Sequence, residues 1–229
     1  LTSNNDFDEF LVSQKKELNN KFSEFVIHNY RNWINKSIDS PLMSNEILKK
    51  KIFNHIGDKP VFLIVIDNLR YDQWKIMESD ISKIFHINED KPYLSILPTT
   101  TEYSRNALFS GLNPLEMSNN YPELWEDKSM GLNNREYEFL DENLKRNNLN
   151  IKHSYHKIIS HSDGLNFSKK KSDLLRYDLN SIVFNFIDML SHSSTENKLF
   201  KNLAYDEKSF RSFSLSLIHI SEPTRLSGI

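Results

Sequence analysis

The sequence contains no cysteine, which removes one whole class of stabilising and metal-binding chemistry. Disulfide bonds and thiolate metal sites are excluded, so any metal ion must be held by Asp, Glu, His or Thr side chains. A lack of cysteine also suits a protein that works in a reducing compartment, and we expect this compartment to be the cytoplasm.

A strong charge of one sign and long apolar runs are missing as well. The chain has 29 Lys and Arg residues against 31 Asp and Glu residues, a formal net charge of -2. The chain as a whole therefore has no basic field that would attract nucleic acid. The longest apolar run, Val61–Ile66, is far too short to span a bilayer, so we expect no membrane partner.

Both ends of the chain have unusual features. It begins with Leu1 rather than methionine, and we expect that its N-terminus has been cut from a longer protein. The stretch LSLIHISEPTR (Leu215–Arg225) looks like the translation of a transposase-type sequencing adapter. We therefore expect residues 215–229 to be an assembly artefact that replaces a natural continuation past Ser214. The alternative is an ordinary C-terminal strand and loop.

Periodic apolar residues predict helices at the beginning of the chain. Phenylalanine, leucine and tryptophan recur at spacings of three, four and seven up to Ile34, and Ser40-Pro41 ends this pattern. Ser44 is a candidate N-cap for a second helix over about residues 45–55. We therefore expect residues 1–58 to form a helical linker or bundle.

Beyond the turn-forming residues Gly57–Pro60, strand and helix patterns alternate. Such alternation predicts an α/β fold with a mostly parallel sheet flanked by helices, which we assign to residues 59–214. The strands are expected at Val61–Ile66, 93–97, 150–155 and 181–187, and the helices at 71–85, 102–110, 134–146 and 195–213.

Two of the expected strands end in an aspartate. VFLIVID ends at Asp67 and SIVFNFID ends at Asp188. Ligands of open α/β sheets lie beyond the carboxyl ends of the strands, so both carboxylates can reach one shared crevice. His192 follows Asp188 with helical spacing, and Asp and His are suitable zinc ligands. The structural alternative is that each aspartate caps the helix that follows it.

The stretch PTTTEYSRNALFSG (Pro98–Gly111) places three threonines where a strand gives way to a helix. Thr99 and Glu102 fit a capping box, which is the structural alternative. A functional threonine here would have its hydroxyl near free backbone N–H groups and the positive end of a helix, a setting that binds phosphate. Arg70 and Arg105 lie near the same crevice, where either could bind phosphate or form a structural ion pair.

Together these residues resemble the PglZ branch of the alkaline phosphatase superfamily. From about Phe7 to Ser214 the chain is also similar to response regulators of Bacteroidetes that carry such an effector domain, without their receiver domain. The resemblance implies a truncated alkaline-phosphatase-like sheet that follows a helical linker. The motifs that carry it are VIDNLRYDQW, ILPTTTEYSRNALFSGLNPLEM, SYHKI and VFNFIDMLSH.

The resemblance implies roles for four residues. Thr101, in the pattern P-x-x-T, would be the nucleophile and would bridge toward a second zinc ion bound by Asp67. Asp188 and His192 would bind the first zinc ion. The family's remaining ligands, an Asp-His pair before a glycine and a further histidine, have no counterpart in this sequence outside the adapter-like stretch. We therefore expect the chain by itself to be inactive or nearly so.

The implied function is zinc-dependent hydrolysis of a phosphoester or nucleotide-like substrate, as a phosphodiesterase or phosphatase. The domain would be the effector of a two-component response regulator that signals to transcription and to type IX secretion. Its implied partners are a sensor histidine kinase, acting through the missing receiver domain, a sigma factor or secretion component, and a second copy in a homodimer. One alternative is a non-catalytic, zinc-stabilised module that binds a regulatory partner. A simpler alternative is an α/β domain whose aspartates and threonines only cap helices.

Overall fold

The computed structural model describes residues 3–36, 39–125, 134–185 and 188 of the chain. The chain divides into two compact units, Leu1–Met43 and Ser44–Ile229. Within the described residues, every helix is too short or too polar to cross a membrane. The domain boundary expected at residue 58 and the adapter-like tail stay predictions.

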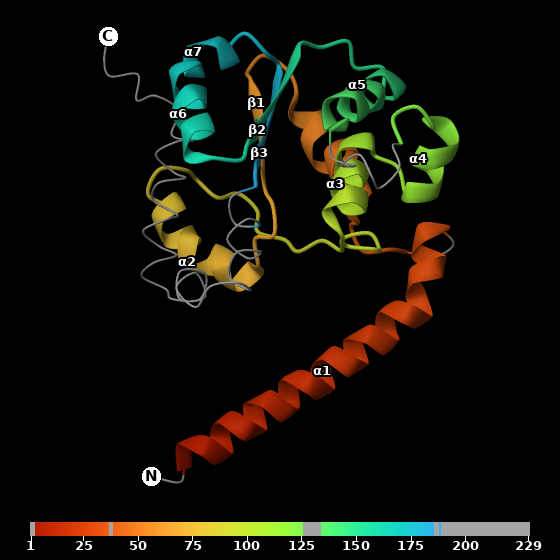
Figure 1. Cartoon of the computed structure of the whole chain (residues 1–229), viewed down its shortest axis with the longest axis vertical. Helices are drawn as coiled ribbons and strands as arrows, with labels where there is room; N and C mark the ends of the chain where they lie inside the picture. The colour runs from red at the N-terminus through yellow and green to blue at the C-terminus, as the bar shows by residue number, and fades with distance from the viewer. Residues whose placement is uncertain (1–2, 37–38, 126–133, 186–187, 189–229) are drawn as a thin grey trace. The chain divides into compact units, whose positions relative to one another are not determined.

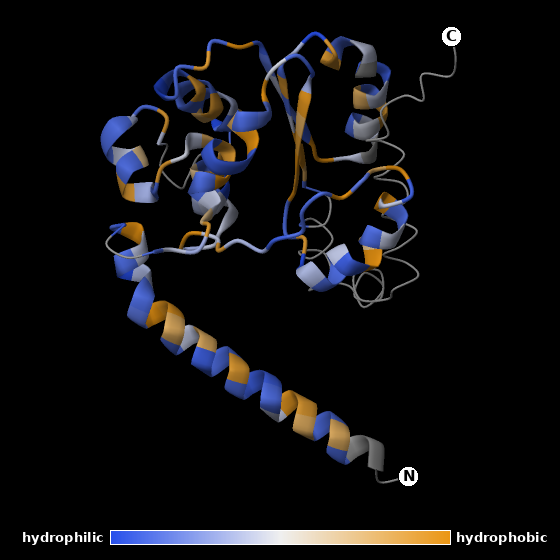
Figure 2. Ribbon diagram, turned by 180° about the vertical axis from the view of Figure 1, so that it is seen from behind, coloured by the Kyte–Doolittle hydropathy of each residue, from blue (hydrophilic) through white to orange (hydrophobic). Residues whose placement is uncertain are grey.

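The first unit contains one long helix, α1, which runs from Ser3 to Ile34 and confirms the predicted N-terminal helix. Figure 2 shows apolar bands that recur along it among polar ones. Its apolar side chains are largely exposed, with exposed fractions of 61% for Phe7, 65% for Leu18 and 54% for Phe22.

The predicted second helix is confirmed over residues 44–55, where it consists of three short helical pieces of 3-10 or π geometry. These are η1 (Ser44–Glu46), η2 (Leu48–Ile52) and η3 (Phe53–His55). Ser44, predicted as the N-cap, is the first residue of η1, and its buried Oγ accepts a hydrogen bond from the Ile96 N–H at 3.1 Å. The stretch around Leu94, predicted as a strand, makes only an isolated bridge, in which the Leu94 carbonyl accepts from the Ser44 N–H at 2.9 Å.

The sheet of the second unit confirms the predicted parallel α/β architecture. Its three described strands are β1 (Val61–Ile66), β2 (His153–Ile158) and β3 (Leu179–Phe184), all parallel, in the order β1-β3-β2. In register, Phe184 pairs with both Ile66 and Ile158. The carboxyl ends of the three strands are therefore aligned at one edge of the sheet.

Helices cover both faces of this sheet (Figure 1). The α3 and α5 helices lie on one side, and α2, α6 and α7 lie on the other. Three of the predicted helices are confirmed as α2, α3 and α5 with shifted ends, and the one at 195–213 lies outside the described residues. The helices are α2 (Tyr71–Ile81), α3 (Thr101–Ser110), α4 (Pro114–Asn120), α5 (Glu136–Arg146), α6 (His161–Lys169) and α7 (Lys171–Leu174).

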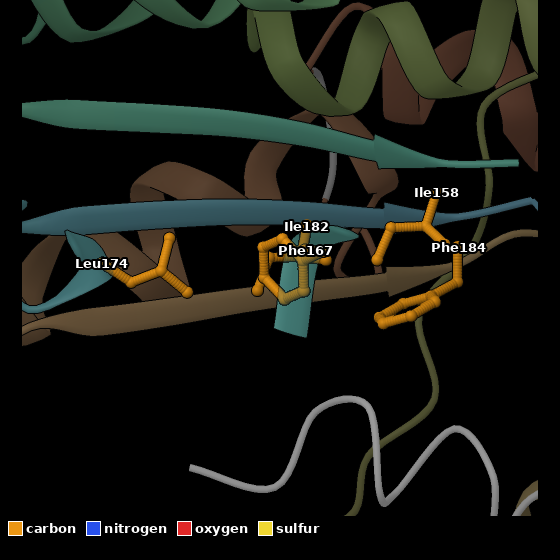
Figure 3. Close-up of a cluster of buried hydrophobic side chains, with 5 residues drawn as sticks. All are labelled: Ile158, Phe167, Leu174, Ile182 and Phe184. Carbon is orange, nitrogen blue, oxygen red and sulfur yellow. The ribbon is translucent and has the colours of Figure 1, made fainter. Parts of the chain in front are cut away.

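Apolar side chains on the face toward α6 and α7 form the buried cluster shown in Figure 3. Since side chains alternate across a strand, every second residue of the sheet points to this face. Full burial of one such side chain contributes about 1.5–3 kcal/mol. The cluster consists of Ile158, Phe167, Leu174, Ile182 and Phe184, with Ile66 packed against it.

The turn after α3 generates the first prediction. Gly111 has φ +71°, and a Cβ added there would lie 2.9 Å from the side-chain oxygen and nitrogen of Asn143. Asn143 cannot retreat easily, because its Nδ2 donates to the Phe109 carbonyl at 2.9 Å. We expect Gly111→Ala to lower the free energy of unfolding by about 1–3 kcal/mol, measured by urea denaturation.

Gly57 offers a matched control, because a Cβ added there would meet no atom within 4 Å and its φ is not in the left-handed region. Gly57→Ala is expected to leave the stability nearly unchanged. Equal losses in the two variants would contradict the role assigned to Gly111.

Candidate active site

A pocket of about 480 Å³ lies at the carboxyl edge of the sheet. Asp67, Thr101 and Asp188 line it together, although they are far apart in the sequence. Other polar residues that line it include Thr99, Thr100, Ser104, Arg70 and Arg105. The fourth predicted site residue, His192, lies outside the described residues.

Asp67 directly follows β1, where Asn68 turns the chain with a φ of +60°. The Oδ2 atom of Asp67 accepts a hydrogen bond from Arg105 Nη1 at 2.9 Å. The next helix, α2, begins after Arg70, whose N–H donates to Gln73 Oε1 at 3.0 Å. The alternative that Asp67 caps α2 is therefore wrong.

Burial is the main reason that the pKa of Asp67 lies above its ordinary range. The neighbouring carboxylates of Asp188 and Glu136 raise this pKa further, while the guanidinium of Arg105 opposes the shift. Carboxylates that share a desolvated site repel one another in their charged forms. A cation at this position would relieve that repulsion.

The three threonines lie at the beginning of α3. Thr100 is the N-cap residue, but its side chain makes no capping hydrogen bond, and Thr101 is the first residue of the helix. The carbonyls of Thr99 and Thr100 instead accept hydrogen bonds from Ser104 Oγ at 3.2 and 3.1 Å. The capping box predicted as an alternative for Thr99 and Glu102 is not the cap that begins α3. Thr101 thus lies in the pocket at the positive end of a helix.

A buried polar network lies behind Asp67, and sequence reasoning found only part of it. Arg105 Nη1 donates also to Asn185 Oδ1 at 2.8 Å, and Arg105 Nε donates to Glu136 Oε1. Tyr155 donates its hydroxyl hydrogen to the other oxygen of Glu136. Arg105 therefore forms the structural ion pair that was one of its two predicted roles.

The roles of Asn185, Glu136 and Tyr155 were missed. Asn185 directly follows β3, just as Asp67 directly follows β1. The predicted strand ended at residue 187, whereas β3 ends at Phe184, and a prediction with the correct end would have indicated Asn185 as a site residue. Nothing in the local sequence around Glu136 distinguishes it from the other acidic residues of its helix.

Of two further basic residues, one lines the pocket and the other interacts electrostatically with Asp67. Arg70 lines it and forms a two-pronged ion pair with Asp72 at 3.0 and 2.9 Å. Lys157, on β2, is close enough to Asp67, Glu136 and Arg105 for their charges to act on it. Burial lowers the pKa of Lys157 below its ordinary value.

The donors in the pocket fit a divalent cation in kind. Asp67 and Asp188 provide carboxylates and Thr101 a hydroxyl, and such oxygen donors bind zinc and magnesium. Within the described ranges, no group of three or more His, Asp or Glu residues gathers to hold a metal. The metal roles of these residues therefore stay predictions.

Comparison with known protein families identifies one match. A model described as the BREX system PglZ alkaline phosphatase-like domain matches residues 47–224, which include all three described strands and the pocket-lining residues named above. No curated protein matches the chain significantly.

The raised pKa of Asp67 predicts how its removal affects stability. The folded state binds this proton more tightly than the unfolded state, so the ionised carboxylate opposes folding at neutral pH. We expect Asp67→Asn to raise the thermal unfolding midpoint at pH 7 with a chelator present. The gain should shrink as the pH falls through the raised pKa of the folded state, and it should vanish below about 4, where Asp67 is protonated in both states.

Asp72 provides a control of opposite sign. A hydrogen bond from Arg70 holds the pKa of Asp72 below its ordinary value, so its ionised form favours folding. Asp72→Asn should therefore lower the unfolding midpoint slightly at pH 7, and this loss should disappear in acid. A lower midpoint for Asp67→Asn at pH 7 would refute the interpretation.

Proposed function

Because the chain belongs to the PglZ alkaline phosphatase-like family over residues 47–224, we propose that it carries a metal-dependent phosphodiesterase or phosphatase domain. The family suggests a phosphoesterase-type function, and alkaline phosphatase-like proteins generally use metal ions. The observation that carries the proposal is that Asp67, Thr101 and Asp188 line one pocket at the carboxyl edge of a parallel sheet.

In the proposed reaction, the hydroxyl oxygen of Thr101 attacks the phosphorus of the substrate. A new bond from this oxygen to phosphorus forms while the bond to the leaving oxygen breaks, and the leaving group takes up a proton. Water then hydrolyses the phospho-threonine and restores the hydroxyl. Backbone N–H groups at the beginning of α3 would hold phosphate oxygens close to Thr101.

Metal ions, which we propose to be zinc, would lower the pKa of the Thr101 hydroxyl and balance the charge on phosphate. Asp67 and Thr101 would hold one ion, and Asp188 with His192 the other. Two protein ligands bind zinc poorly, and the family's further Asp-His pair has no counterpart in this sequence. We propose that full activity needs metal ligands beyond these four, supplied by the uninterrupted gene product.

The regulatory part of the proposal rests on the resemblance to the PorX response regulator of Bacteroidetes. A cytoplasmic sensor kinase would phosphorylate a receiver domain ahead of α1, and the effector domain would act on transcription and secretion. The exposed apolar side chains of α1 support a role in pairing with another helix, since helices in proteins gain most of their stability by packing an apolar face against a partner.

The same observation favours a second candidate function, a non-catalytic module that binds a sigma factor or secretion component. Two results would favour the binding role: a Thr101→Val variant still captures such a partner, and a variant without α1 does not. The two roles are compatible, because an active effector domain can also bind a partner.

The nucleophile assignment predicts that Thr101→Val abolishes hydrolysis of bis(4-nitrophenyl) phosphate by the zinc-loaded gene product. Valine keeps the shape of threonine but removes the hydroxyl, so kcat should fall by at least about 10³-fold while the protein stays folded. Thr100→Val is the matched control, because the Thr100 side chain lines the same pocket and makes no capping hydrogen bond. Full activity in Thr101→Val would remove Thr101 from this role.

The proposed mechanism predicts that hydrolysis is lost when the metal is removed and recovers when zinc is added back. Dialysis of the gene product against a chelator should abolish hydrolysis, and added zinc should restore it, because the threonine hydroxyl does not ionise by itself at neutral pH. Bound metal is measured by atomic emission before and after dialysis. Unchanged hydrolysis in a metal-free preparation would contradict the proposed mechanism.

A further inference from the structure

Five separate elements contribute residues to a polar network around Arg105. Arg105 comes from α3, and its partners are Glu136 from α5 and the two residues that follow β1 and β3, Asp67 and Asn185. Tyr155 on β2 extends this set by donating to Glu136. The set ties the helix that carries Thr101 to the strand end that carries Asp67.

The side chains of the network become more exposed from the protein interior toward the pocket. The exposed fraction of the side chain is 0% for Glu136, 3% for Arg105 and 15% for Asp67. Only its outer members, Arg105 and Asp67, line the pocket. Glu136 and Tyr155 are not part of the pocket lining, so their hydrogen bonds reach the pocket through Arg105, while the charge of Glu136 also acts directly on Asp67.

Charge balance explains why the inner residues are needed. A buried guanidinium close to Asp67 alone would compete with any cation for this carboxylate. Glu136 neutralises Arg105 from the opposite side, and Tyr155 stays a hydrogen-bond donor because burial and the Glu136 carboxylate raise its pKa. Arg105 can thus orient Asp67 while its charge is shared between two carboxylates.

We propose that Arg105, Glu136 and Tyr155 are positioning residues that hold Asp67 in one orientation for binding a divalent cation. This inference rests on the proposed function, in which Asp67 is a metal ligand. Arg105 Nη1 donates to Oδ2 at 2.9 Å, so in this proposal Asp67 would offer the cation its other oxygen, Oδ1. Partners of this kind orient metal ligands and affect metal affinity by about 10–100-fold.

The test measures zinc affinity, not activity, in the uninterrupted gene product. Zinc dissociation constants are determined by competition with a chromogenic chelator for the wild type, Asp67→Asn, Glu136→Gln and Tyr155→Phe. Glu136→Gln leaves the charge of Arg105 to act on Asp67 alone, so the dissociation constant should rise by about 10–100-fold. Tyr155→Phe keeps the Arg105–Glu136 pair and should cause a smaller rise, which tests the proposal even where Glu136→Gln fails to fold.

Ser154→Ala is the matched control for a purely structural effect. Ser154 Oγ donates to Asn180 Oδ1 at 2.7 Å in a buried hydrogen bond on the opposite face of the sheet. Melting temperatures recorded with a chelator show how far each variant is destabilised. Ser154→Ala should lower the melting temperature and leave the zinc dissociation constant unchanged.

The outcomes separate the two levels of the proposal. One outcome would overturn the positioning role and leave the proposed function standing. In it, zinc binds the wild type, Asp67→Asn loses zinc binding, and Glu136→Gln and Tyr155→Phe bind zinc normally. Weakening in Ser154→Ala equal to that in Glu136→Gln would overturn the positioning role as well, since affinity would then follow general stability. If the wild type binds no zinc, or Asp67→Asn binds it normally, the proposed metal role of Asp67 falls and the positioning role falls with it.

Discussion

The buried ion pair between Arg105 and Glu136 is the constraint on which the second unit depends. Both side chains are almost completely shielded from water, so neither charge is stable without the other. Loss of one partner from such a pair typically costs about 3–5 kcal/mol, because an uncompensated charge stays buried. The pair therefore fixes α5 against α3, and through Asp67 and Asn185 it fixes both helices against the ends of β1 and β3.

One face of the sheet holds a buried apolar cluster, and the other face carries the polar residues near the pocket. The face toward α6 and α7 holds the apolar cluster around Ile182 and Phe184, whose burial favours folding. The face toward α3 and α5 carries Asp67, Asn185 and Tyr155, whose polar groups need partners once they are buried. The raised pKa of Asp67 shows that its charged form is tolerated at a cost to stability, as is common at functional sites.

Parallel pairing explains how distant residues reach one pocket. The strands end in register at Ile66, Ile158 and Phe184, so the segments that follow them share one edge. At this edge the beginning of α3 adds Thr101 and the positive end of the helix dipole. A phosphoester centre needs a nucleophile beside fixed positive charge and carboxylates that can hold a cation. These are the roles proposed for Thr101, the beginning of α3, Asp67 and Asp188.

The sequence by itself determined the elements whose signals are local. The run Val61–Ile66 predicted β1 at its observed bounds, and Gly111 correctly marked the end of α3, because an apolar run and a left-handed turn depend on neighbouring residues. Only the tertiary structure decided the strand order β1-β3-β2, the hydrogen bond from the Ile96 N–H to the Ser44 hydroxyl and the burial of Glu136. These features depend on contacts between residues tens of positions apart, and a charge or hydroxyl has the same local sequence signal whether it faces water or a buried partner.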